Sequence, residues 1–164
     1  MDDFDLCDHL WQLAVDHFYE SGEDEEEPQC NYPESLYAAD LPDHWWTAYG
    51  VHAFEYDVLA GGIRQFLDNH NGLTNDKTSS AFRAIGHPEL AAAFDVVGGA
   101  YIAFSKARFP EDRELTDEEY TRADSDLDAE LLKEGEEFER IHKSLDLRGA
   151  LANYIRSNLT LFTI

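Results

Sequence analysis

Polar side chains that could do acid–base chemistry gather around two adjacent glycines in the middle of the chain. Glu55 precedes Gly61-Gly62, and the amides Gln65 and Asn69 follow it, four residues apart and therefore on one face of a helix. A carboxyl group enclosed with two amides could have a raised pKa, as general acids and bases do. The same groups could instead satisfy backbone atoms freed by a helix bend, and we expect this structural role.

Other catalytic, metal-binding and phosphate-binding patterns are missing from the sequence. His52 and Glu55 lie three residues apart and His44 lies two turns earlier, but no Glu-x-x-His pair or third ligand accompanies them. The doublets Gly61-Gly62 and Gly98-Gly99 lack the glycine spacing, the lysine and the preceding strand of a phosphate-binding loop. No nucleophile elbow occurs either. We therefore expect neither an enzyme nor a bound cofactor or metal ion.

Carboxylates are the most abundant groups that could bind a partner, and they are unevenly distributed. The chain has 35 Asp and Glu against 12 Lys and Arg, a net charge of -23. Residues 1–27 hold 11 acids and no Lys or Arg, and residues 111–139 hold 14 acids against three bases, so these two segments carry 25 of the 35 acids. Such a charge repels nucleic acid and anionic membranes. It favours a basic partner, a salt-rich medium or solubility alone.

The composition predicts one folded domain over residues 1–164. Hydrophobic residues make up 43% and aromatic residues 13% of the chain, enough for a core. No secretory signal is visible, and no run approaches the roughly 20 apolar residues of a membrane span, so we expect a cytoplasmic protein. The two cysteines, Cys7 and Cys30, are too few for a disulfide framework. We expect free thiols, with a single Cys7–Cys30 bridge as the alternative.

Apolar residues recur at helical spacing, and no stretch alternates as a strand would. The expected fold is all-α, a compact bundle of about six to eight helices with a bend at Gly61-Gly62. The acidic residues 20–34 are expected to form a flexible loop. Helices are predicted from an N-cap at Asp2 or Asp3 for about 17 residues, from Pro42 through the bend to the turn at Asn71-Gly72, over 77–85 and 88–108, from Asp124 or Ser125 to about Lys143, and over 147–159.

The expected core contains an aromatic stripe and one close helix crossing. Both glycine doublets lie between apolar residues, which predicts that the two helices carrying them approach closely there. The apolar tail 159–164 is expected to pack down or to join a subunit interface. The stripe before the first doublet consists of Trp45, Trp46, Tyr49, His52, Ala53, Tyr56 and Leu59.

The second acidic segment is expected to present a row of carboxylates. Thr116-Asp117-Glu118-Glu119 is a capping box. On a helical wheel Leu127, Leu131, Phe138, Ile141 and Leu145 share the buried face, on which Glu134 also falls. The flanks and the outside hold Asp126, Asp128, Glu130, Glu136, Glu137 and Glu139. Carboxylates one turn apart lie roughly 6 Å apart along the axis. B-DNA carries a phosphate per roughly 3.4 Å on each strand, so such a helix edge could be a sparse copy of it.

The residues around the first doublet resemble those of a known family. The pattern Glu55-x3-Leu59-x-Gly61-Gly62-x2-Gln65-Phe66-x2-Asn69 is similar to the signature of the family named after a bacterial DNA-mimic protein, and the similarity extends over roughly residues 36–160. Ala60 stands where that family more often has asparagine. The resemblance implies a small acidic helical protein that presents carboxylates, in place of DNA phosphates, to a basic DNA-binding protein such as a transcriptional regulator or a histone-like protein.

We therefore expect a DNA-mimic surface and a structural motif. Two alternatives stay open: an immunity or antitoxin protein that inhibits a basic nuclease or toxin, and a halophile-type acidic protein, since only 4 of the 12 bases are Lys. A homodimer is a further expectation. The structural motif comprises Glu55, Gly61, Gly62, Gln65, Phe66 and Asn69. The expected mimic surface comprises Glu23, Asp24, Glu25, Glu26, Glu27, Asp117, Glu118, Asp126, Asp128, Glu130, Glu136, Glu137 and Glu139.

Overall fold

The chain folds entirely into helices in the ranges that the computed structural model describes, which are residues 2–19, 42–70, 75–108 and 114–162. The all-α prediction is therefore confirmed for these ranges. The elements are α1 (Asp3–Tyr19), α3 (Asp43–Asn69), α4 (Asn75–Ala84), α5 (Pro88–Arg108), α6 (Asp117–His142), α7 (Leu147–Ser157) and a short 3-10 helix, η1 (Leu159–Leu161).

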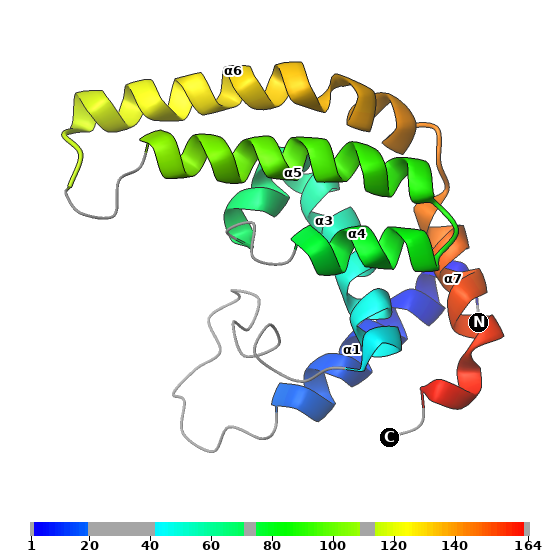
Figure 1. The fold of residues 1–164 in the computed structure, drawn as a ribbon. Helices are drawn as coiled ribbons and strands as arrows, with labels where there is room; N and C mark the ends of the chain where they lie inside the picture. Colours follow the sequence, from blue (N-terminus) through cyan, green and yellow to red (C-terminus); the bar gives the residue numbers. More distant parts are fainter. Residues whose placement is uncertain (1, 20–41, 71–74, 109–113, 163–164) are drawn as a thin grey trace.

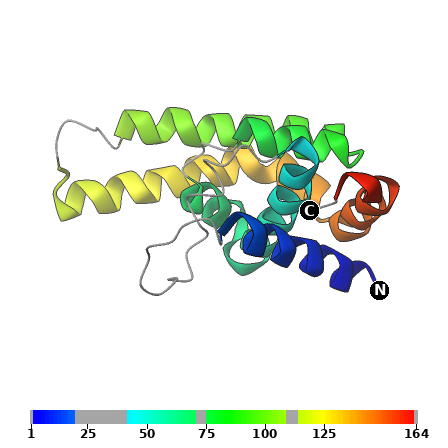
Figure 2. The same cartoon turned by 90° about the horizontal axis from the view of Figure 1, so that it is seen from below.

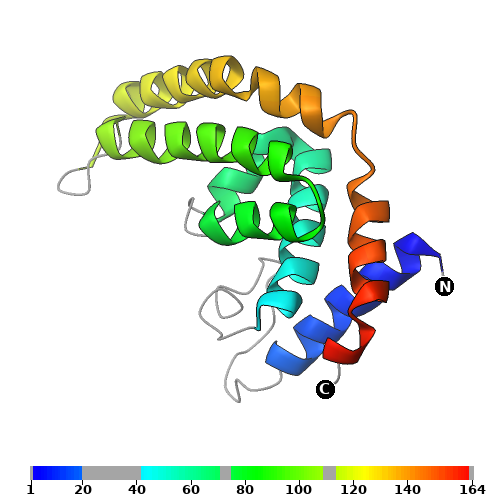
Figure 3. The same cartoon turned by 45° about the vertical axis from the view of Figure 1, so that its right-hand side comes forward.

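Two long helices form an antiparallel pair along one side of the molecule. α5 and α6 lie side by side, α4 packs against α5, and α3 passes beneath them (Figure 1). α1 and α7 pack against the first part of α3 and against each other, at the opposite side from the α5–α6 pair (Figure 3). The end of α5 and the beginning of α6 extend beyond α4, so this end of the pair projects from the rest of the bundle (Figures 1 and 2).

An aromatic cluster fills the centre, where four helices meet. Phe54 of α3 lies edge-on to Phe66, Phe82, Phe94 and Phe138, with ring centroids 4.8 to 5.9 Å apart. Each of these five side chains is at most 2% exposed. Edge-to-face contacts of this kind add to the large apolar area that phenylalanine buries. The cluster therefore fixes α3, α4, α5 and α6 to one another.

The predicted aromatic stripe is confirmed in its first half and wrong in its second half. Trp45, Trp46, Tyr49 and Ala53 are buried and His52 is half-buried, but Tyr56 is 60% and Leu59 72% exposed. The buried face continues instead through Phe54 and Asp57, both fully buried. A helical wheel that places every carboxylate outside puts Asp57 on the exposed side. The expected buried face is therefore rotated from the observed one by about one residue, which is 100° on a helix.

The bend at the first glycine doublet is confirmed. Gly61 (φ -151°, ψ 17°) and Gly62 (φ +78°, ψ -176°) leave helical geometry, and the helix resumes directly after them. The conformation of Gly62 is one that essentially only glycine adopts without strain. A Cβ atom on Gly61 would overlap the Gln65 side chain.

The predicted close crossing of the two doublets is wrong. A Cβ atom placed on Gly62 or on Gly99 would have no neighbour within 4 Å, and Gly98 makes room for the Asn75 side chain of α4. The first doublet is needed for its backbone conformation, and Gly98 for close contact with α4 rather than with α3.

α6 begins seven residues earlier than predicted. The capping box is confirmed: Glu119 N donates to Thr116 Oγ1 (3.3 Å), and Thr116 N donates to Glu119 Oε2 (3.0 Å). The box starts one continuous helix of 26 residues, because no glycine or proline interrupts residues 117–124 and Ala123 extends the buried face. The predicted buried residues Leu127, Leu131, Phe138 and Ile141 are confirmed.

Two further segments bear on the sequence predictions. By length and composition α5 is apolar enough to cross a bilayer, yet Leu90, Phe94, Val97 and Tyr101 along it are buried within the bundle. Near the C-terminus, Phe162 packs edge-on against Trp45, with ring centroids 5.1 Å apart, so the expected packing of the tail is confirmed for this residue. Cys7 is buried as a free thiol, and Cys30 lies outside the described residues.

Candidate partner-binding surface

α6 is the most acidic described element. Its sequence has 11 Asp and Glu against three bases, Arg122, Lys133 and Arg140, which gives a net charge of -8 with histidine neutral. Its apolar side faces the bundle and packs along α5. The carboxylates therefore occupy the rest of its circumference. The helix itself runs along the upper edge of the molecule in Figure 1.

Three predicted surface residues are carboxylates without an ion-pair partner among the described residues. Asp117, Glu118 and Glu136 are exposed. Asp117 and Glu118 line an open hollow of about 520 Å³ on the outside of the first turns of α6, together with Thr121, Arg122, Ser125 and Asp126. The structure thus brings Asp117, Glu118 and Asp126 together along one hollow, and Glu136 lies ten residues beyond Asp126, almost three turns further along the same helix.

Four other predicted residues, two exposed and two half-buried, are engaged in salt bridges. Glu137 accepts two hydrogen bonds from Arg140 (2.6 and 2.7 Å), which lower the pKa of its carboxyl group. Exposed pairs of this kind exchange readily with other cations. The remaining pairs are Glu139 with Lys143 (2.6 Å), Asp126 with Arg108 (3.7 Å) and Glu130 with Lys133 (3.8 Å).

Asp128, also predicted for the surface, belongs to a cluster around Arg64. The Arg64 guanidinium contacts Asp124 (2.5 Å), Asp128 (2.6 Å) and Asp68 (2.8 Å). Partial burial lowers the pKa of Arg64, but the three carboxylates raise it by more. The pKa of Arg64 therefore lies above its usual value. Tyr101 of α5 donates a hydrogen bond to Asp68 (3.0 Å). The cluster therefore joins α3, α5 and α6.

The motif residues occupy structural positions on both sides of the bend. Glu55 accepts a hydrogen bond from Arg148 Nε of α7 (2.9 Å), and Phe66 belongs to the aromatic cluster. Asn69 Nδ2 donates to Asp57 Oδ1 (3.1 Å). Because Asp57 precedes the bend and Asn69 follows it, this bond closes the bend. Gln65 is half-buried and lies against Gly61.

A buried pair that the sequence did not reveal completes this arrangement. His70 Nε2 lies 3.1 Å from Asp57 Oδ2, and each side chain is 1% exposed. His70 also packs on Phe66, with ring centroids 4.4 Å apart. No substrate could reach groups so deeply buried, so the pair serves to hold the bend. The available signal was the 12- and 13-residue spacing from Asp57 to Asn69 and His70, which becomes a contact only once the helix bends.

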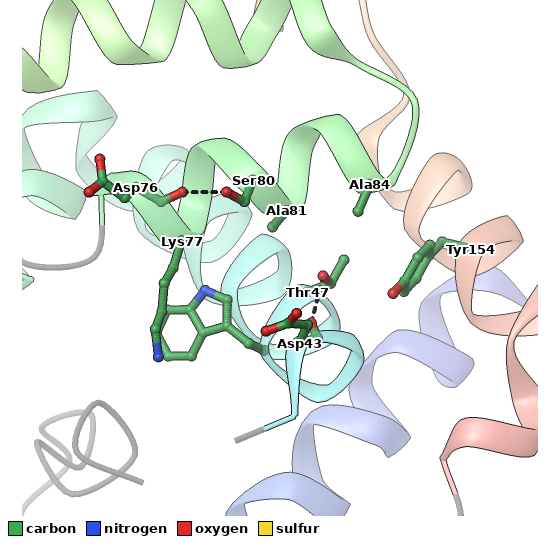
Figure 4. Close-up of a pocket in the computed structure, with 9 residues that line it drawn as sticks. Asp43, Thr47, Asp76, Lys77, Ser80, Ala81, Ala84 and Tyr154 are labelled. Carbon is green, nitrogen blue, oxygen red and sulfur yellow. Dashed lines mark hydrogen bonds between the residues drawn. The ribbon is translucent and has the colours of Figure 1, made fainter. Parts of the chain in front are cut away.

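A separate cavity of about 340 Å³ lies between α3, α4 and α7 (Figure 4). Two of its hydroxyl groups are engaged locally: Thr47 donates to the Asp43 carbonyl oxygen and Ser80 to the Asp76 carbonyl oxygen, both at 2.8 Å. Lys77 Nζ lies 4.7 Å from the centre of the Trp46 ring. None of the residues predicted for a site lines this cavity.

The acidic run Glu23 to Glu27, predicted as part of the mimic surface, lies outside the described residues, and its role stays a prediction. Within the described ranges, no three His, Cys, Asp or Glu side chains converge so as to hold a metal ion.

Comparison with known proteins gives one match. The sequence model of a protein family described as DMP19-like protein matches residues 39–158, a range that contains α3 to α7 and leaves out α1. No curated protein and no solved structure matches the chain.

Proposed function

The chain belongs to the DMP19-like protein family, a family of DNA-mimic proteins, and we propose that it uses the carboxylates of α6 to occupy the DNA-binding surface of a basic protein. A transcriptional regulator or a histone-like protein is the partner class we favour. With a net charge of -23, the chain is not expected to bind nucleic acid itself. The role requires fixed negative charge rather than a catalytic group.

The observation that carries the proposal is the exposed acidic side of α6. Asp117, Glu118 and Glu136 have no ion-pair partner among the described residues, and the exposed pairs along the helix can exchange their cations for those of a partner. DNA-binding proteins gain much of their affinity by neutralising phosphates and releasing counterions. Carboxylates held on a packed helix can compete for the same Lys and Arg side chains while presenting no base edges.

The test is displacement of DNA from a purified histone-like protein. Fluorescein-labelled duplex is bound to that protein, and addition of the chain is expected to release it. Direct binding of the chain to that protein, measured without DNA, should weaken steeply as salt is raised from about 50 to about 200 mM, because the contacts are ionic. Absence of release at the lower salt concentration, or a direct affinity indifferent to salt, would contradict the proposal.

Two matched triple variants distinguish an effect of the α6 surface from an effect of the net charge of the chain. Substituting Asp117→Asn, Glu118→Gln and Glu136→Gln should reduce release and lower the slope of log affinity against log salt by up to about 3. The control set Asp5→Asn, Asp16→Asn and Glu89→Gln removes as many exposed charges from α1 and α5. Equal effects of the two sets would show that bulk charge, not this surface, displaces DNA.

A further inference from the structure

Arg64 makes more ionic contacts than any other base in the described residues. It follows the bend by two residues, and its three guanidinium nitrogens contact Asp68 of its own helix and Asp124 and Asp128 of α6. Nη1 also lies 3.4 Å from the Asp124 carbonyl oxygen. The side chain is 24% exposed, so these contacts are screened less than those at the surface.

Arg64 contacts α6 in the projecting half of that helix. Asp124 and Asp128 lie in the first half of α6, which extends beyond α4 alongside the end of α5 (Figure 1). The aromatic cluster meets α6 at Phe138 and at His142, both near the other end of that helix. Arg64 is therefore the contact from α3 that supports the part of α6 carrying Asp117, Glu118 and Asp126.

We propose that Arg64 is the positioning residue of the acidic surface. This inference rests on the proposed function, because it concerns how that surface is presented. The bend at Gly61-Gly62 directs Arg64 toward α6, and one guanidinium then contacts three carboxylates and offsets part of their charge. Without it Asp68, Asp124 and Asp128 would face one another, and like charges between α3 and α6 would push the projecting half of α6 away from the bundle.

The proposal predicts that losing the Arg64 guanidinium weakens binding to a basic protein, whereas a role in charge alone predicts the opposite change in affinity. Replacing Arg64 with glutamine makes the chain more negative, so a role in charge alone predicts tighter binding to a basic protein. A positioning role predicts weaker binding, because displaced carboxylates no longer meet the partner together. Arg140→Gln is the matched control: it removes the same charge from an exposed pair within α6 and should release DNA at least as well as the unmodified chain.

The experiment compares the unmodified chain, Arg64→Gln, Arg64→Lys and Arg140→Gln in two assays. The first is amide hydrogen exchange of α6 residues 117–131, which needs no partner. Arg64→Gln should speed exchange there by about tenfold while α3 residues 45–57 stay protected, and Arg140→Gln should leave both segments unchanged. Lysine keeps the charge but lacks the planar fork, so Arg64→Lys should be intermediate. Unchanged exchange in Arg64→Gln would overturn the inference.

The second assay is the displacement of labelled duplex from the histone-like protein. Arg64→Gln should release DNA about tenfold less well, and adding Asp124→Asn and Asp128→Asn to it should restore exchange protection. Faster exchange combined with tighter competition would also overturn the inference. If the unmodified chain released no DNA, the proposed function would fail, and the exchange assay would by itself decide whether Arg64 positions α6. Should Arg64→Gln not fold, Arg64→Lys and the control decide in the same way.

Discussion

Gly62 is the residue whose substitution has the clearest expected effect on stability. Its φ of +78° with ψ near -176° is strained for any residue with a Cβ atom, so Gly62→Ala should lower the free energy of unfolding by about 1 to 3 kcal/mol. Gly99→Ala is the control, because Gly99 lies within helical α5 with open space around it, and alanine there should stabilise by about 0.5 to 1 kcal/mol. Urea unfolding measures both. Equal changes in the free energy of unfolding of the two variants would contradict the backbone conformation of Gly62 at the bend.

His52 should make stability depend on pH. Burial lowers its pKa below the ordinary value of 6.5, although nearby Asp8 opposes the shift. On acidification the unfolded chain therefore takes up the proton first, and the folded state loses stability as the pH falls below about 6.5. Urea unfolding should be measured at pH about 7.5 and about 5.5. The free energy of unfolding of the unmodified chain should exceed that of His52→Gln by less at the lower pH. The exposed His9→Gln serves as control.

At the residue scale, the sequence predicts what is encoded locally. The bend at Gly61-Gly62 could be predicted because two adjacent glycines weaken a helix by roughly 2 kcal/mol, which favours a break in the helix at that point. The burial of Asp57 could not be predicted, because a carboxylate is assigned to the surface unless its partner is known. Here the partners lie beyond the bend. The Arg64 cluster was missed for a similar reason: Asp124 and Asp128 are about 60 residues away along the chain.

At the scale of elements, the capping box sets where α6 begins. Thr116→Ala should lower the free energy of unfolding by about 1 kcal/mol, because the amide of Glu119 loses its acceptor. Thr121→Ala is the control, since this exposed hydroxyl bonds to the Asp117 carbonyl oxygen within the helix and alanine is the better helix former. Urea unfolding and amide exchange in the first turn of α6 check the prediction. Equal losses in both variants would refute it.

Helix boundaries were predictable where the chain marks them. Pro88 opens α5, and the predicted limits of that helix agree with the structure. For α6 the capping box was recognised, but the helix was expected to begin only at Asp124 or Ser125, because residues 117–124 are mostly polar and give little periodicity. The exposure of Tyr56 and Leu59 was unpredictable for a different reason, since it depends on which neighbours pack against α3. Pairwise packing of helices is long-range information.

At the scale of the whole molecule, the distribution of charge separates mimicry from adaptation to high salt. A halophile-type protein would need salt to fold. In this chain the acids concentrate in two segments, and the described core is aromatic and closed. We therefore expect the circular dichroism of a helical protein to persist in about 10 mM salt, with a thermal midpoint that rises modestly as added salt screens the net charge of -23. Unfolding at low salt would favour the halophile-type alternative instead.

The direction in which α6 runs has an electrical consequence. Its N-terminal end lies at the projecting end of the α5–α6 pair (Figure 2). Aligned peptide dipoles place the equivalent of roughly half a positive elementary charge at that end of a helix. Left alone, this would weaken the negative potential where a partner first arrives. Asp117, Glu118 and Glu119 in the first turn more than offset it, so the field stays attractive to cations out to the tip.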